Sequence, residues 1–140
     1  MPGSLPKNRG GIITRLEADL PDLRFVFGRK FAFRAPRTIV VPDDFKESDS
    51  LLVLHEVGHA LTGRFNFETE VERLRIEVLA WGEARKLAEK YGVFIDEDLI
   101  QGELDTYRNW LHQKSRCPNC GLTRFQTPDG AFHCPRCEIN

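Results

Sequence analysis

The sequence has no apolar run of 18 residues, and its first eight residues contain no apolar stretch of the kind found in secretion signals. Neither a membrane-spanning helix nor secretion is therefore expected. No cysteine occurs before residue 117, which excludes a disulfide framework in most of the chain and favours a reducing compartment. From these absences we expect a cytoplasmic protein without membrane contact.

The composition is that of an ordinary globular chain, with 41% apolar and 29% charged residues among 140. Such a chain is long enough to bury one main core. We expect a flexible N-terminus over residues 1–8, a main domain over residues 9–113 and a small C-terminal module over residues 114–140. The sequence gives no indication of an oligomeric state.

An apolar helical segment, residues 51–61, contains the pattern His-Glu-x-x-His at His55, Glu56 and His59. Residues four apart lie on one face of a helix, so the two histidines can bind one Zn²⁺ with Glu56 beside its open positions. The alternative is a core helix with two hydrogen-bonded histidines. The apolar surroundings and Gly58, placed to face a neighbouring element, favour a catalytic zinc site with Glu56 as general base.

A long helix is expected over residues 70–91, where positions 77, 81, 84 and 88 form one stripe. Glu77 therefore faces inward together with Trp81. A buried carboxylate needs a partner, and a metal ion is a suitable one, which makes Glu77 the predicted third zinc ligand. An ion pair with Arg73 is the alternative, and Glu70 and Glu83 are second choices for the ligand.

Other residues of this region have predicted roles as well. Thr69 and Glu72 form a capping box, which assigns Glu72 a structural role at the start of the long helix. Three further side chains are of a type that can hydrogen-bond an oxyanion, although each is more often a core or rim residue: Tyr91, Tyr107 and His112.

The motif at residues 55–59, followed 18 positions later by Glu77 in Glu-Val-Leu-Ala-Trp, resembles a minimal gluzincin. Among small zincins the chain is similar to the SprT-like and ImmA/IrrE-like groups. The resemblance covers about residues 10–95 and implies peptide-bond hydrolysis of a protein substrate. It also implies a sheet edge near the active-site helix on which an extended substrate pairs. SprT-like proteins commonly carry a C-terminal zinc-binding module and act on DNA-associated proteins, whereas ImmA/IrrE-like proteins act on transcriptional repressors.

All four cysteines lie in two Cys-x-x-Cys pairs separated by thirteen residues: Cys117, Cys120, Cys134 and Cys137. This spacing is typical of a zinc ribbon, and residues 127–130 supply the turn between the pairs. Four thiolates close a tetrahedral site, so this zinc is predicted to be structural. A redox pair is the alternative. His133 is expected not to bind the metal.

The predicted fold is α+β: a minimal zincin core, with a small sheet, the active-site helix and the ligand helix, followed by the four-cysteine ribbon. Spacing of apolar residues predicts an amphipathic helix over residues 9–20 and another helix from residue 96 onward. Phenylalanines alternate with other residues over residues 23–27 and 31–34, which predicts a β-hairpin whose phenylalanines point inward. Residues 38–41 are predicted to form a third strand.

Charge is unevenly distributed along the chain. Residues 1–37 carry eight Lys or Arg against three acidic residues, whereas residues 38–111 carry eight against sixteen. Arg24, Lys30 and Arg34 would lie on the outer face of the hairpin, where they and the ribbon can contact nucleic acid. The alternative is an ordinary solvated face.

Two functions follow from these features. The first is zinc-dependent hydrolysis of a protein or peptide substrate, with two zinc ions per chain. The second is a non-catalytic zinc-containing module that binds nucleic acid or transcription machinery. Glu56 distinguishes them, because a structural metal site has no chemical need for a general base.

Overall fold

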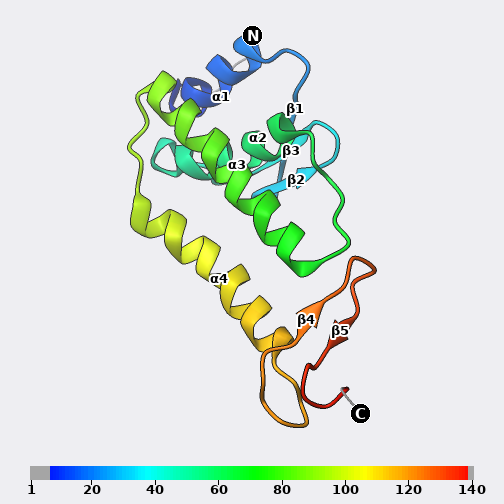
Figure 1. The fold of residues 1–140 in the computed structure, drawn as a ribbon. Coiled ribbons are helices and arrows are strands. Elements are labelled where there is room, and N and C mark those ends of the chain that lie inside the picture. Colours follow the sequence, from blue (N-terminus) through cyan, green and yellow to red (C-terminus); the bar gives the residue numbers. More distant parts are fainter. Residues whose placement is uncertain (1–6, 139–140) are drawn as a thin grey trace. The chain divides into compact units, whose positions relative to one another are not determined.

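A computed structural model describes residues 7–138, so residues 1–6 of the predicted flexible N-terminus lie outside the described residues. Lys7 and Asn8 belong to the first helix. The fold is α+β, with small sheets and four α-helices among the described residues (Figure 1). In chain order the elements are α1 (Lys7–Asp19), β1 (Arg24–Gly28), β2 (Ala32–Arg34), β3 (Thr38–Pro42), a 3₁₀ turn (Glu47–Asp49), α2 (Ser50–Thr62), α3 (Glu70–Tyr91), α4 (Glu97–Ser115), β4 (Phe125–Gln126) and β5 (Phe132–His133).

The described chain forms two compact units. One contains residues up to 65 together with residues 79–96, and the other contains residues 66–78 together with residues from 97 onward. The helix α3 is continuous and contributes to both. No helix among the described residues is long and apolar enough to cross a membrane.

The three-stranded sheet has the order β1-β3-β2, so the predicted hairpin between residues 23–27 and 31–34 is wrong. Strand β3 lies between them, parallel to β1 and antiparallel to β2. The physical reason is burial: Ile39, Val40 and Val41 are all at most 4% exposed, and a strand this apolar on both faces is most stable at the centre.

The predicted inward orientation of the four phenylalanines is wrong for one of them. Phe27, on the edge strand β1, is 39% exposed, whereas its register partner Val41 on the central strand β3 is fully buried. Phe25, Phe31 and Phe33 are half-buried. The helix α2 packs against β2 and β3, so the phenylalanine of β2 lies on the side of the sheet that this helix covers.

The first helix is held in the same unit by its apolar face and by the end of α3. Ile12, Ile13 and Leu16 are at most 2% exposed, as the helical spacing predicted. The Tyr91 hydroxyl donates a 2.6 Å hydrogen bond to the Asp19 carboxylate. Burial and this bond raise the pKa of Tyr91 to about 12, so this tyrosine has a structural role in holding α1 against α3.

Both helices that carry the site have ends that the sequence predicts. Helix α2 ends at Gly63 in the left-handed conformation (φ 68°), and Gly92 has the same conformation after α3 (φ 71°). The capping box is present: the Glu72 amide donates to Thr69 Oγ1 and the Thr69 amide donates to Glu72 Oε1. The amides of Glu68 and Thr69 lower the pKa of the Glu72 carboxyl.

Candidate metal centres

The structure brings His55, His59 and Glu77 together. Their ligand atoms all lie within 4.8 Å of one another, and His55 and Glu77 are each 8% exposed. A single metal ion between them is within reach of all three side chains. Two imidazoles and a carboxylate form a donor set that Zn²⁺ accepts, and a metal would also offset the cost of burying the carboxylate. The residues therefore fit a metal ion.

A close approach of two helices fixes this arrangement. A Cβ atom on Gly58 would lie 2.2 Å from the carbonyl oxygen of Ala80, so only glycine allows α2 to approach α3 this closely. Gly58 lies between the two histidines of α2, and Ala80 lies three residues after Glu77 on α3. The contact therefore lies next to all three ligand residues.

Two aromatic rings hold the imidazoles in place. Trp81, which is fully buried, stacks on His55 with ring centroids 4.1 Å apart and an angle of 2° between the planes. Phe33 of β2 stacks on His59 at 5.8 Å with an angle of 13°. Sequence reasoning placed both rings in the core but missed these stacking roles. Rings that restrict imidazole rotation reduce the entropy that ordering the ligands costs when a metal binds.

Glu56 lies beside the cluster without being one of its three members. Its Oε2 atom is 3.6 Å from His55 Nδ1, and its side chain is 13% exposed. A partly shielded carboxylate next to a potential metal ligand can accept a proton from a water molecule at the site.

The other carboxylates considered for the third ligand are engaged elsewhere. Glu70 Oε2 lies 3.4 Å from Lys114 Nζ, and Glu83 Oε2 lies 3.2 Å from Lys86 Nζ. Neither belongs to the cluster of potential ligands with His55 and His59.

Arg73, the alternative partner of Glu77, lies against aromatic rings. Its guanidinium carbon is 4.9 Å from the centre of the Trp110 ring and 5.3 Å and 5.5 Å from those of Tyr107 and Phe67. This arrangement gives Arg73 cation–π partners in its own unit.

The three residues considered as oxyanion donors have other surroundings. Tyr107 lies in the aromatic group around Arg73, Tyr91 donates a hydrogen bond to Asp19, and His112 is exposed on α4.

The four cysteines form the second cluster, with all sulfur atoms within 4.8 Å of one another. Cys117 and Cys137 Sγ are 3.8 Å apart, and Cys120 and Cys134 Sγ are 3.5 Å apart. A tetrahedral zinc with bonds of about 2.3 Å to sulfur requires sulfur atoms about 3.8 Å apart. The cluster therefore fits a zinc ion closely.

Backbone amides favour the thiolate form of two of the four cysteines. Amides of Cys120 and Asn119 hold the pKa of Cys117 at about 6, and the amide of Cys137 lowers the pKa of Cys134. The thiolate is the form that binds metal, so both shifts favour binding.

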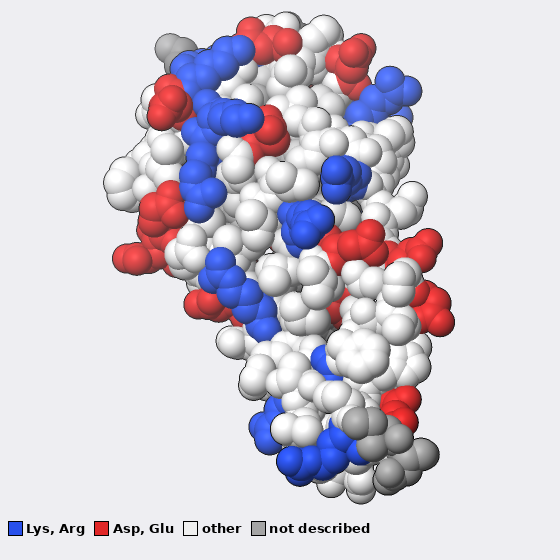
Figure 2. Space-filling view, in the orientation of Figure 1, with Lys and Arg blue, Asp and Glu red and all other residues white. Residues whose placement is uncertain are grey.

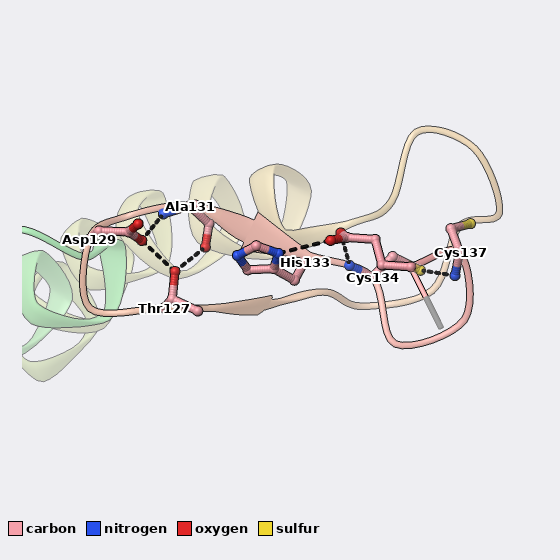
Figure 3. A network of polar contacts seen from close by, with 7 residues as sticks. Thr127, Asp129, Ala131, His133, Cys134 and Cys137 are labelled. Atoms are coloured by element: carbon pink, nitrogen blue, oxygen red, sulfur yellow. Dashed lines mark hydrogen bonds and ion pairs between the residues drawn. The ribbon is translucent and has the colours of Figure 1, made fainter. Parts of the chain in front are cut away.

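The hairpin of β4 and β5 supports the cysteine pairs (Figure 3). At its turn, the Thr127 hydroxyl and the Ala131 amide donate to Asp129. At its other end, Glu138 accepts the Cys134 amide at 2.8 Å and contacts His133 Nδ1 at 2.9 Å. The ring of His133 is thus directed to a carboxylate, and it is not among the cluster's potential ligands.

The three basic residues predicted to contact nucleic acid are all exposed. Arg24 and Arg34 are both register partners of Thr38, so they lie on one face of the sheet with β3 between them rather than on a hairpin. Lys30 lies in the connection between β1 and β2. A cavity of about 520 Å³ beside Arg24 is lined by acidic and basic residues, including Glu17, Asp22 and Arg37.

On the face shown in Figure 2, acidic side chains lie on both sides of a column of Lys and Arg side chains. Binding of nucleic acid by Arg24, Lys30 and Arg34 stays a prediction.

Comparison with protein families, with curated proteins and with solved structures gives no match to this chain.

Proposed function

We propose that this protein is a zinc-dependent peptidase of gluzincin type. The observation that carries the proposal is the cluster of His55, His59 and Glu77 within 4.8 Å, with the Glu56 carboxylate beside it. A structural metal site needs only ligands, whereas hydrolysis also needs a base next to an incompletely filled coordination sphere. Three protein ligands and a neighbouring carboxylate meet that requirement.

Each residue has a separate role in this proposal. His55, His59 and Glu77 would hold the zinc, and Trp81 and Phe33 would keep the imidazoles oriented. Zinc bound there supplies Lewis-acid polarisation of a carbonyl and lowers the pKa of coordinated water toward about 7. Glu56 accepts the proton of the attacking water and later donates it to the leaving amine, so that the proton is conserved over the reaction.

Strand β2 offers a binding surface for an extended substrate. It pairs only with β3 in the described sheet, so its outer edge has backbone donors and acceptors that can pair with a peptide. Phe33 of this strand stacks on His59, which places the strand next to the candidate site. A peptide paired to β2 would thus run close to His59.

The four-cysteine cluster has a structural role in this proposal, as a closed zinc site. Confinement of all cysteines to that cluster supports a cytoplasmic location, where thiols remain reduced. The resemblance to SprT-like and ImmA/IrrE-like proteins supports a protein substrate that is associated with DNA or its regulation.

The variant Glu56→Gln tests the proposal because it changes the base without removing a ligand. We expect it to retain the zinc content and fold of the parent and to lose about 10²- to 10⁴-fold in peptidase rate. The measurement is cleavage of an unfolded protein or a peptide library, with zinc content determined in the same samples. Glu83→Gln, at a half-buried glutamate paired with Lys86, is the matched control and should cleave normally.

Equal cleavage by the parent and the Glu56→Gln variant would refute the role of Glu56. Zinc binding without cleavage by either protein would instead favour the non-catalytic module that binds nucleic acid or transcription machinery.

A further inference from the structure

Gln126 connects the cysteine hairpin to the first residue of α3. Its Oε1 atom accepts a 2.7 Å hydrogen bond from the Glu70 amide, and its Nε2 atom donates a 2.9 Å bond to the Gly130 carbonyl. The first amides of a helix have no partner within the helix and must find one elsewhere. The Thr69 hydroxyl accepts a hydrogen bond from the Glu72 amide, and the Gln126 side chain accepts one from the Glu70 amide. The cap of α3 is therefore shared between a local residue and a residue 56 positions away.

Two further contacts hold the same region within this unit. The Glu70 carboxylate pairs with Lys114 at the end of α4 at 3.4 Å. A Cβ atom on Gly130, at the turn of the cysteine hairpin, would lie 2.9 Å from the Glu68 carbonyl. The hairpin backbone thus lies directly against the residues that precede α3.

Glu77 lies on the same helix, two turns after Glu70. Helix ends open more readily than helix centres, because their backbone hydrogen bonds depend on caps and on packing. Between these residues, the Arg73 guanidinium lies against the rings of Phe67, Tyr107 and Trp110. The orientation of Glu77 therefore depends on a helix start that residues of α4 and the cysteine hairpin hold in place.

We propose that Gln126 is a positioning residue for the His55, His59 and Glu77 cluster. By capping α3, it makes the metal affinity of that cluster depend on the folded cysteine hairpin, and hence on a filled four-cysteine site. This inference rests on the proposed function, because it requires Glu77 to be a metal ligand. The sequence does not predict this role of Gln126, because no local motif indicates that its side chain caps a helix 56 residues earlier.

The test measures zinc affinity in the full chain and does not depend on activity. Zinc is titrated in competition with a chromophoric chelator, while fluorescence of Trp81, stacked on His55, reports filling of the adjacent cluster. All proteins carry Trp110→Phe, because Trp110 is the only other tryptophan and its emission would overlap. Circular dichroism and thermal unfolding verify that the single-residue variants are folded and that the double cysteine variant keeps its α-helices.

Gln126→Ala should weaken zinc binding at the Trp81-reported site by about three- to tenfold. This is less than the roughly 10–100-fold typical of a residue bonded directly to a ligand. Gln126→Glu keeps an acceptor for the Glu70 amide but loses the donor to the Gly130 carbonyl, so it should restore part of the affinity. Gln113→Ala, at an exposed glutamine of α4 in the same unit, should match the parent.

Replacing Cys117 and Cys134 together by serine should weaken binding at the Trp81-reported site at least as much as Gln126→Ala does. Parent-like affinity in Gln126→Ala or in the cysteine variant overturns the inference, as does a Gln126→Glu variant as weak as Gln126→Ala. Glu77→Ala separates the two proposals. If it weakens binding while Gln126→Ala does not, the metal site stands and the positioning role fails. If Glu77→Ala leaves the affinity unchanged, the proposed site itself fails.

Discussion

The four cysteines that could bind a metal lie within 21 consecutive residues, whereas the other cluster combines two potential ligands from α2 with one from α3. The cysteines need only a short hairpin and backbone amides to come together. The cluster of His55, His59 and Glu77 needs the close contact of Gly58 with Ala80 and two stacked rings. A local cluster is thus defined by sequence spacing, while a cluster assembled from two helices depends on tertiary packing.

The two clusters also differ in what surrounds them. Four thiolates fill a tetrahedral coordination sphere and leave no position for a substrate. The other cluster offers three ligands and has a carboxylate, Glu56, next to it. This difference is the basis for our proposal that the first cluster has a structural role and the second a catalytic one.

The largest expected effect comes from removing the metal of the four-cysteine cluster. Cys117→Ser together with Cys134→Ser should abolish zinc binding there and unfold residues 116–138, because small zinc modules owe their folding to the metal. Loss of dispersed amide signals from these residues in NMR spectra is the measurement. Glu77→Ala is the control and should leave those signals in place. A hairpin that stays folded without its thiolates would show that the cluster is not a structural metal site.

The variant Glu77→Ala should lower zinc affinity at the other cluster by more than the roughly 10–100-fold that removal of an outer partner costs, because it removes a ligand itself. Zinc counted per chain should fall from two to one under mild chelation. The matched variant Glu83→Ala should retain two, since its carboxylate pairs with Lys86. Glu70→Ala should weaken binding less than Glu77→Ala does, because it loses a contact with Lys114 at the start of α3 and no proposed ligand. Loss of a zinc in either of them, with two retained by Glu77→Ala, would move the ligand assignment to that residue.

The variant Gly58→Ala tests the packing that only the two-helix cluster needs. The added methyl would lie 2.2 Å from the Ala80 carbonyl, so we expect a loss of about 1–3 kcal/mol in the free energy of unfolding. The cysteine hairpin should stay folded. Gly82→Ala, also within a helix but with nothing within 4 Å of the new Cβ, should be neutral or stabilising by about 0.5–1 kcal/mol. Chemical denaturation measures both, and equal effects would refute the close-approach argument.

The smallest effect concerns the basic residues outside both clusters. If Arg24, Lys30 and Arg34 bind nucleic acid, replacing all three by alanine should reduce the slope of log affinity against log salt by about 0.7 to 0.9 for each phosphate that these residues neutralise. Fluorescence anisotropy with labelled single- and double-stranded DNA measures this. Binding that is absent at low salt, or a slope that does not change, would leave these residues as a solvated face.

Local features of the fold were predictable from the sequence, because each depends on residues close together in the chain. The helix stops at Gly63 and Gly92 and the capping box of Thr69 and Glu72 are of this kind. The strand order was not predictable, since two neighbouring segments in which phenylalanines alternate with other residues suggest a hairpin. Only the burial of Ile39 and its neighbours on both faces shows that β3 lies between them.

The candidate site divides in the same way. His55 and His59 follow from helical spacing alone, and Glu77 follows from the apolar stripe that it shares with Trp81. The helix cap from Gln126 and the stacking of Phe33 on His59 join residues 56 and 26 positions apart. Contacts of this separation leave no periodic signal in the sequence.

The most direct measurement is a crystal structure of the zinc-loaded chain with anomalous diffraction recorded at the zinc edge. We predict two anomalous peaks. One should be bound by the four cysteine sulfurs at about 2.3 Å, and the other by His55, His59 and Glu77 at about 2.0–2.2 Å, with a solvent molecule between the ion and Glu56. A single peak at the cysteines, or a second peak with four protein ligands and no solvent position beside Glu56, would contradict a catalytic zinc site.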